Sequence, residues 1–268
     1  MIRNSVVKRI AALLALVLLL GILGGCAKKG DLLDQVKKSG KLNIGTEGDW
    51  APWTYHDEND KLVGFDVELG AKIAEYLGVK PVYHETDWDS ILAGVDAGRF
   101  DIACNGVSYT EDRAEKYLFS EPYAYDDTVL VVAADNNDIH GLADLKGKKT
   151  ANTISSAYAQ LAEENGATVT GVNTLLETIE LVKQGRVDAT INAAVSINDY
   201  LKEHPDAGVK IVGVVYRDTL VFPVRKGANS EKFIAEVNAC LQKMRENGEL
   251  KALSEKYFGM DISEKGDK

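Results

Sequence analysis

The chain has 268 residues, of which 45% are hydrophobic and 27% charged, so it can bury a sizeable core and is not disordered throughout. Its formal net charge of −10 becomes −13 without the first 25 residues, which hold three basic and no acidic side chains. This acidity argues against a nucleic-acid partner and against electrostatic binding to an anionic surface.

The N-terminus has the pattern of a secretion signal. Basic residues at 3, 8 and 9 precede an apolar run over 10–23, which is short for a membrane span. The run ends in Leu23-Gly24-Gly25-Cys26, which resembles the lipobox of bacterial lipoproteins. We therefore expect a signal peptide over 1–25, a lipid on Cys26 and a tether over 26–37, which together anchor the protein to the outside of the cell membrane. An ordinary signal peptide with an incidental cysteine is the alternative.

After the tether, strands and helices alternate. The first half predicts strands at 41–46, 81–83 and 101–104, helices at 65–77 and 89–97, and a hairpin over 53–63. The alternation restarts with strands at 128–133, 150–153, 168–171 and 188–191 and helices at 156–165, 175–184 and 195–203. This is the pattern of an α/β fold with mostly parallel sheets.

A weak internal repeat suggests that the two halves are built alike. Residues 97–105 and 184–192 share one pattern: a helix end, Gly-Arg, an apolar residue, Asp, a short strand and then Asn. Open α/β sheets bind ligands beyond the carboxyl ends of their strands. Asn105 and Asn192 stand at two such ends, so we expect a small-molecule cleft between two α/β lobes.

Cysteine and histidine give no sign of a metal or cofactor. Cys104 lies in a predicted strand and Cys240 in an apolar helical stripe, so two buried free thiols are favoured over a disulfide. The four histidines lack metal-ligand spacing, and no phosphate-binding, nucleophile-elbow or dinucleotide motif occurs. An enzymatic function would have to rest on carboxylates alone.

One arginine breaks a rule of helix electrostatics. Thr110 is a good N-cap, which places Arg113 near the third position of a short helix, facing the positive end of its dipole. A surface arginine paired with Glu111 or Asp112 is the plain interpretation. A receptor for a carboxylate is the functional one, because a guanidinium forms two parallel hydrogen bonds to a carboxylate.

Several motifs together resemble the extracytoplasmic solute-binding proteins, family 3, of polar amino-acid ABC importers. They lie in order at residues 45–53, 62–69, 86–89, 104–113, 119–123, 144–148, 185–188 and 256–259. The segment 151–211 looks closest to the cystine-binding branch. The resemblance implies a two-lobe, periplasmic-binding-protein-like (type II) fold with a ligand cleft and a hinge of two crossings. Lobe 1 is expected to hold 38–127 plus 223–268, and lobe 2 to hold 128–222.

The resemblance also implies a ligand site. Arg113 would receive the ligand's α-carboxylate, with Ser108 as a further donor, the Gly106 carbonyl as acceptor for an ammonium, and Asn105 at the border of the pocket. The remaining positions that match the family's ligand-binding residues are the flanking aromatics Trp50 and Trp88, the acid Glu47, the helix start at Ser155 and Ser156, and Asn192.

Two positions depart from the family pattern on the amino-acid head-group site. Ala157 stands where Thr or Asn is common, and Ala193 stands where an Asp commonly holds the α-ammonium. These losses favour a ligand without a free α-amine, because a buried ammonium needs an acceptor. The alternative is an amine held by neutral acceptors such as the Gly106 carbonyl, with Glu47 supplying charge.

The resemblance therefore implies a binding protein rather than an enzyme. It would capture an amino acid or related carboxylate by hinge closure and deliver it to a membrane permease, as a monomer and without a cofactor. The ligand-sensing subunit of a signalling receptor is one alternative. A dehydratase-like enzyme on the same fold is another, with Glu47 as its evident acid–base candidate.

Overall fold

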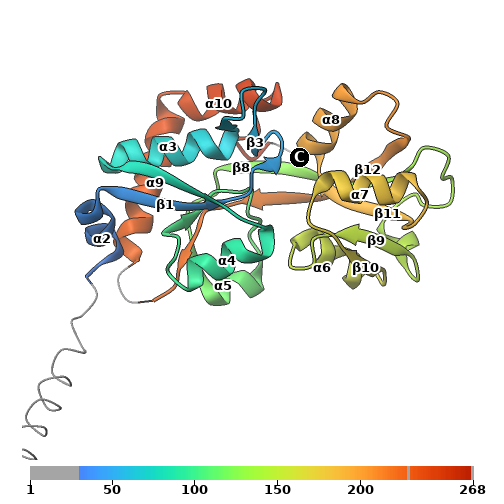
Figure 1. Ribbon diagram of the computed structural model, residues 1–268, viewed down its shortest axis with the longest axis horizontal. Helices are drawn as coiled ribbons and strands as arrows, with labels where there is room; N and C mark the ends of the chain where they lie inside the picture. Colours follow the sequence, from blue (N-terminus) through green and yellow to red (C-terminus); the bar gives the residue numbers. More distant parts are fainter. Residues whose placement is uncertain (1–29, 228–229, 267–268) are drawn as a thin grey trace, which may run out of the picture.

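The computed structural model describes residues 30–227 and 230–266 and has two α/β lobes joined by two long strands (Figure 1). Cys26 and the rest of the expected signal and lipid anchor lie outside these residues, together with the first part of the tether. Within the described part of the chain, no helix is both long and apolar enough to cross a membrane.

Lobe 1 is built on a parallel sheet in the order β5-β1-β6. Two antiparallel sheets, β2-β3-β4 and β13-β7, lie beside it. Its elements are α2 (Leu32–Ser39), β1 (Lys41–Thr46), β2 (Asp49–Trp50), β3 (Thr54–His56), β4 (Leu62–Val63), α3 (Phe65–Leu77), β5 (Lys80–Glu85), α4 (Trp88–Asp96), β6 (Ile102–Ala103), α5 (Glu111–Lys116), β7 (Tyr117–Phe119), β13 (Pro223–Arg225), α9 (Glu231–Glu246) and α10 (Glu249–Phe258).

Lobe 2 is built on one mixed sheet in the order β10-β9-β11-β8-β12. Strands β9, β10 and β11 run parallel, whereas β8 is antiparallel to both of its neighbours. The elements are β8 (Ala124–Ala133), the 3₁₀ helix η1 (Leu142–Leu145), β9 (Lys149–Asn152), α6 (Ala157–Glu164), β10 (Thr168–Gly171), α7 (Leu175–Lys183), β11 (Ala189–Ala193), α8 (Ala194–Glu203) and β12 (Val209–Leu220).

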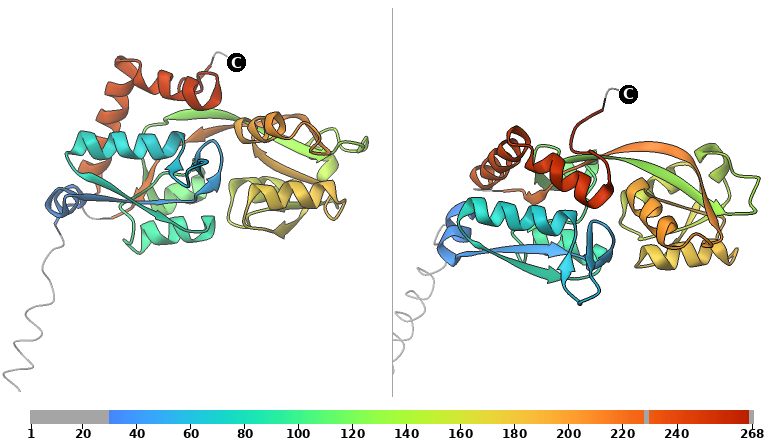
Figure 2. Two further views of the ribbon diagram at one scale, coloured as in Figure 1. Left: turned by 45° about the horizontal axis from the view of Figure 1, so that its top comes forward. Right: turned by 90° about the horizontal axis from the view of Figure 1, so that it is seen from above.

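Strands β8 and β12 form the ribbon that connects the lobes (Figure 2). They pair from Ala124 opposite Leu220 to Ala133 opposite Val209, with two register irregularities near Gly213 and Tyr216. The sequence analysis placed the first of these strands at 128–133 and missed the second. The lobe 1 ends of both strands continue the ladder into the hinge, where buried residues alternate with partly buried ones and no continuous apolar run marks a strand.

The internal repeat corresponds to one structural device used in both lobes. Asp101 and Asp188 come three residues after Gly98 and Gly185, which have left-handed backbone conformations. Each Asp forms hydrogen bonds to the neighbouring strand. The carboxylate of Asp101 accepts from the Asn43 amide at 2.8 Å, and that of Asp188 accepts from the Lys149 amide at 2.7 Å. In both cases the backbone N–H of the Asp returns a bond of 2.8 Å to the carbonyl of the same residue.

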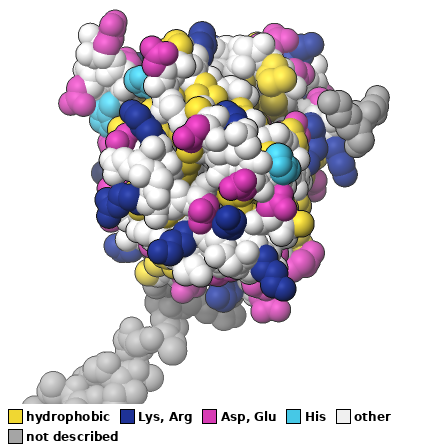
Figure 3. Space-filling view, turned by 90° about the vertical axis from the view of Figure 1, so that its right-hand side faces the viewer, with side chains coloured by type: hydrophobic (Ala, Val, Ile, Leu, Met, Phe, Trp, Pro, Cys, Tyr) yellow, Lys and Arg dark blue, Asp and Glu magenta, His cyan; other side chains and the backbone are white. Residues whose placement is uncertain are grey.

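Separate apolar cores stabilise the lobes. Lobe 1 buries Trp53, Phe65, Phe222 and Phe233 between its sheet and α3, α9 and α10, whereas lobe 2 has one cluster on each face of its sheet. Cys104 and Cys240 are buried free thiols, as expected. Position 223 was expected to lead directly into C-terminal helices, but it begins the short strand β13 that pairs with β7. The outer end of lobe 2 carries interspersed acidic and basic side chains (Figure 3).

Candidate functional site

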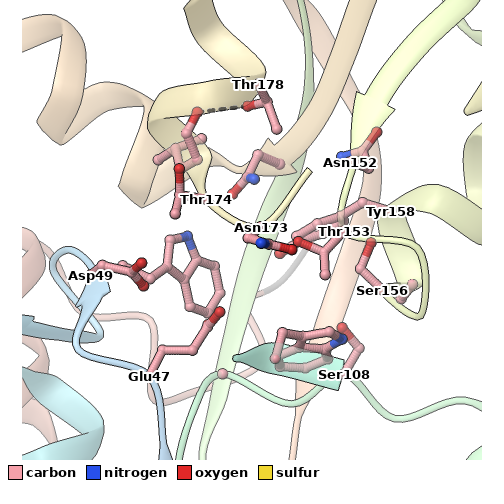
Figure 4. Close-up of a pocket in the computed structure, with 16 residues that line it drawn as sticks. Glu47, Asp49, Ser108, Asn152, Thr153, Ser156, Tyr158, Asn173, Thr174 and Thr178 are labelled. Carbon is pink, nitrogen blue, oxygen red and sulfur yellow. Dashed lines mark hydrogen bonds between the residues drawn. The ribbon is translucent and has the colours of Figure 1, made fainter. Parts of the chain in front are cut away.

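A cleft of about 570 Å³, partly open to solvent, lies between the lobes. Lobe 1 contributes the β1–β2 region, the start of α4 and the turn after β6, and lobe 2 contributes the starts of α6 and α7 (Figure 4). The lining residues are Glu47, Asp49, Trp50, Trp88, Gly106, Ser108, Asn152, Thr153, Ser156, Ala157, Tyr158, Asn173, Thr174, Leu175, Thr178 and Asn192.

Seven of the ten expected ligand residues line this cleft, and three do not. Those on the lining are Glu47, Trp50, Trp88, Gly106, Ser108, Ser156 and Asn192. Asn105 is fully buried behind the wall, and Arg113 and Ser155 lie where the two lobes meet. Asn105 was expected to border the pocket, and in the structure its side chain bonds Glu47, Thr46 and Thr54 behind the lining.

Glu47 is held as a half-buried carboxylate at one side of the cleft. Asn105 donates from its amide nitrogen to the Glu47 carboxylate at 2.6 Å and accepts from the Glu47 backbone N–H, also at 2.6 Å. Burial raises the pKa of Glu47 to about 7, and Asp49 close by adds to the rise. Burial and neighbouring acids also raise the pKa of Asp49. This wall suits a cationic group, which would favour the ionised form of both carboxylates.

The aromatic side chains of the cleft rest on a tightly packed turn. Trp50 stacks on the buried Trp53, with ring centroids 5.6 Å apart. Gly106 has a φ of +54°, and a Cβ at this position would come within 2.6 Å of the Trp50 ring. Two separate reasons therefore require glycine at position 106: its backbone conformation and its lack of a side chain. The buried carboxylate of Asp66 accepts from the Gly106 N–H at 2.6 Å, which fixes the turn.

Arg113 is a buried cation between the lobes, with 9% of its surface exposed. Thr110 caps α5 as expected, and its hydroxyl accepts from the Arg113 N–H at 3.2 Å. The guanidinium donates to the carbonyls of Ser108 at 2.9 Å and Ser155 at 3.2 Å, and it lies 5.4 Å from the centre of the Trp88 ring. Desolvation lowers the pKa of Arg113.

No ion pair within 4.0 Å is formed by Arg113 with any residue in 30–227 or 230–266. Pairing with Glu111 or Asp112 is therefore not what holds it. A buried guanidinium with neutral partners remains suited to an incoming carboxylate, because a charge-assisted bond would offset its desolvation.

The lobe 2 wall consists of two helix starts and neutral side chains. Ser156 caps α6, and Thr174 caps α7 in a capping box with Glu177. Exposed backbone N–H groups at helix starts attract anionic groups. Sequence reasoning missed Asn173, Thr174 and Thr178 here; the capping pattern Thr-x-x-Glu at 174–177 was the available signal. It also missed Asn152, which is the last residue of β9, much as Asn105 comes shortly after β6 and Asn192 is the second-last residue of β11.

Ser108 does not offer the ligand a hydroxyl hydrogen in this structure. Its Oγ donates to the carboxylate of Asp218 on β12, at 2.5 Å. Burial raises the pKa of Asp218 to about 6, while the Ser108 hydroxyl and nearby Arg113 work against that rise. The expectation that Ser108 adds a donor is thereby corrected for the ionised form of Asp218.

No group of three or more His, Cys, Asp or Glu side chains suited to a metal ion occurs among the described residues. The cleft thus combines a carboxylate wall, two indoles and uncharged hydroxyls and amides, and the buried guanidinium of Arg113 lies beside it, behind Ser108. This set can hold a small molecule that carries charges of both signs.

Comparison with known proteins agrees with this arrangement. The family model for bacterial extracellular solute-binding proteins, family 3, matches residues 42–260. The L-cystine-binding protein TcyA of Bacillus subtilis (strain 168) is 43% identical over 239 residues, which is 88% of each chain.

Two solved structures extend the comparison. The L-cystine solute receptor of Neisseria gonorrhoeae, in an unliganded open conformation, is 40% identical with a TM-score of 0.58, over 88% of this chain and 100% of that one. The ancestral amino acid-binding protein AncCDT-1, a precursor of cyclohexadienyl dehydratase, is 32% identical with a TM-score of 0.76, over 84% and 99%. The chain belongs to the bacterial extracellular solute-binding proteins of family 3.

Proposed function

We propose that the protein captures a zwitterionic amino acid outside the cytoplasm and delivers it to the permease of an ABC importer. One observation carries the proposal: the carboxylates of Glu47 and Asp49 lie on one side of the cleft, and the buried guanidinium of Arg113, which has no ion-pair partner among the described residues, lies at the junction of the lobes beside it. A ligand with an amino-acid head group at each end, such as L-cystine, would place one α-carboxylate at Arg113 and the ammonium of its far end at the wall of Glu47 and Asp49.

L-Cystine is the ligand to test first. The relatives TcyA and the Neisseria receptor are named for L-cystine and cover at least 88% of this chain. We expect L-cystine to raise the thermal midpoint more than any of the twenty standard amino acids. The shift should be easy to measure, because a ligand at 100 times its Kd stabilises the folded protein by about 2.7 kcal/mol. Isothermal titration calorimetry on the strongest hit then gives the Kd. No response to cystine or to any standard amino acid would contradict the proposal.

Binding would work by shifting the population of lobe arrangements. The cleft wall comes from both lobes, so a ligand touches all of it only when they are together. The TM-score is lower for the open Neisseria receptor than for AncCDT-1, although the receptor is more similar in sequence. We attribute this to a smaller angle between the lobes in the present structure, where Arg113 and Ser155 are in contact.

Lipidation at Cys26 would hold the protein on the outer face of the cell membrane, next to the permease. The Leu23-Gly24-Gly25-Cys26 sequence supports this part of the proposal. A Cys26→Ser variant should appear in the soluble fraction after cell lysis, whereas the wild type should sediment with membranes. Equal membrane association of both would rule out the lipid anchor. We expect a monomer, which light scattering on the protein without its signal segment would check.

A dehydratase is the second candidate, because AncCDT-1 is a precursor of such an enzyme and Glu47 has a pKa of about 7 inside the cleft. Incubation with cyclohexadienyl carboxylic acids, followed by chromatography, would reveal turnover. We expect none, since the wall opposite Glu47 offers neutral hydroxyls and amides.

A sensory role would use the same cleft, and deletion of the protein would then change transcription or kinase activity without lowering uptake of labelled cystine.

A further inference from the structure

A buried carboxylate lies directly behind the cleft wall. Asp218 on the hinge strand β12 has 3% of its surface exposed, and it accepts from the Ser108 hydroxyl at 2.5 Å. Within residues 30–227 and 230–266 no cation lies within 4.0 Å of it. Ser108 itself lines the cleft, so one hydroxyl separates the negative charge from the ligand space.

The bond decides what Ser108 can offer a ligand. A serine hydroxyl has one hydrogen and two lone pairs, and here the hydrogen is committed to Asp218. Towards the cleft, the oxygen is therefore an acceptor, polarised by the carboxylate behind it. A hydrogen-bond donor with positive charge is its best partner.

We propose that Asp218, acting through Ser108, supplies the negative charge that holds the ligand's α-ammonium. This assignment rests on the proposed capture of an amino acid. It gives the amine a partner in a chain where Ala193 replaces the family's usual acid, the loss that otherwise favours a ligand without an amine. Asp218 is thus a positioning residue, and Ser108 is the group that touches the ligand.

The neighbouring contacts match the geometry of an amino-acid head group. The α-carboxylate and α-ammonium sit on one carbon, so their receptors must adjoin. The carbonyl of Ser108 accepts from Arg113 at 2.9 Å, while its hydroxyl bonds to Asp218. Ser108 therefore joins the cationic receptor to the anionic one, and the nearby Gly106 is on the same lining.

Other titratable groups also face Asp218 and bear on any pH test. Asp126 lies opposite it on β8, Arg113 approaches from α5, Tyr158 from α6 and Tyr123 from the start of the hinge. With a pKa of about 6, Asp218 is mostly ionised at pH 7.5 and mostly protonated at pH 5. Protonation would remove the charge and allow the Ser108 hydroxyl to turn towards the ligand as a donor.

The test compares two probes that differ only in their amines: L-cystine, and 3,3′-dithiodipropionate, which has the same carbon and sulfur skeleton without them. We expect the wild type to prefer cystine. In Asp218→Asn the amide can donate to Ser108, so the hydroxyl is free to face an anion. The preference for cystine, measured as the Kd of dithiodipropionate divided by the Kd of cystine, should then fall at least tenfold. Ser108→Ala should lower the ratio similarly, and Ser108→Thr should restore it.

Asp127→Asn is the matched control, because Asp127 lies one residue from Asp126 on the same ribbon and pairs instead with Arg217 at 3.0 Å. It should leave the ratio unchanged. The cystine affinity of the wild type should also fall between pH 7.5 and pH 5 by a larger factor than that of Asp218→Asn. Thermal melts confirm folding of each variant.

An unchanged ratio in a folded Asp218→Asn variant would overturn the assignment, and so would equal losses for both probes. Wild-type protein that binds dithiodipropionate but not cystine would overturn it too, while leaving carboxylate capture intact. Wild-type protein that binds neither probe nor any amino acid contradicts the proposed function itself, and this assignment with it.

Discussion

Arg113 of lobe 1 donates to the backbone carbonyl of Ser155 of lobe 2 at 3.2 Å, across the junction of the lobes. The hydroxyl of the same serine donates to Asp89 on α4 of lobe 1 at 2.5 Å. Lobe 1 therefore forms hydrogen bonds to both the backbone and the side chain of Ser155. These contacts stabilise the closed arrangement without using any atom of a ligand, so they set how far the lobes favour closure beforehand.

Replacing Asp89 with Ala should weaken the contact between the lobes at Ser155. The variant loses the Ser155 bond but keeps Arg113 and the residues of the cleft wall. We expect a larger radius of gyration for the ligand-free protein in small-angle X-ray scattering, and a Kd raised about three- to thirtyfold. Asp89→Asn, which can still accept from the hydroxyl, should lie close to the wild type. A ligand-free radius unchanged in Asp89→Ala would show that the contact does not contribute to closure.

Replacing Arg113 with Ala should abolish most binding. Removal of one partner of a buried charge pair costs roughly 2–5 kcal/mol. Lys should rescue only in part, because a single ammonium lacks the planar fork that matches a carboxylate. Calorimetry with L-cystine measures the effect, with circular dichroism as the check on folding. Wild-type affinity in a folded Arg113→Ala variant would remove this residue from the site.

Glu47 should make binding depend on pH. Its pKa of about 7 means that the free protein carries a proton there below neutrality, and a bound ammonium would favour the ionised form. Binding should therefore release a proton and weaken as the pH falls through 7, by about tenfold at pH 6 relative to pH 8. Calorimetry in buffers of different ionisation enthalpy counts the proton. Glu47→Gln should release no proton when the ligand binds. The same number of protons released by both proteins, with an affinity that does not change with pH, would contradict a role of Glu47 at a ligand ammonium.

The hinge carboxylates should make the ligand-free protein less stable at alkaline pH. Burial raises the pKa of Asp126 to about 7, so the folded chain binds a proton that the unfolded chain releases near pH 4. The resulting stability is fully present below about pH 4, declines as the pH rises towards 7 and is absent above it. Asp126→Asn keeps an acceptor for the Val195 N–H and should raise Tm at pH 8 more than at pH 5.5. Asp127→Asn should give no such gain at pH 8.

Much of the fold was predictable because local patterns agree with it. The helices at 65–77 and 175–183 and the strand at 168–171 follow directly from apolar spacing and caps. The Gly-Arg-x-Asp repeat anticipated two lobes of similar construction. The hinge was harder to predict, since Asp126 and Asp218 interrupt its strands with buried acids that read as loop residues. Their burial depends on pairing between segments about 90 residues apart, for which the local sequence has no signal.

The site divides in the same way. Arg113, Trp50 and Trp88 stand in motifs with a chemical reason, and the structure brings them to one cleft or its edge. Asp218 carries no motif, and only its hydrogen bond to Ser108 reveals it. Asn105 shows the reverse, because a residue at a strand end can face inward and support its neighbour instead of facing the ligand.

The pairing of β8 with β12 also has an evolutionary consequence. Because Thr128 lies opposite Tyr216, the chain enters and leaves lobe 2 at neighbouring points. The intervening stretch of gene is therefore a cassette that recombination between relatives can replace in one event. Such an exchange would bring in a new wall in place of Asn152, Asn173 and Thr174 while keeping Glu47 and Arg113. An exchange of this kind would change the shape of one wall of the cleft while the charged groups of the other wall stay in place.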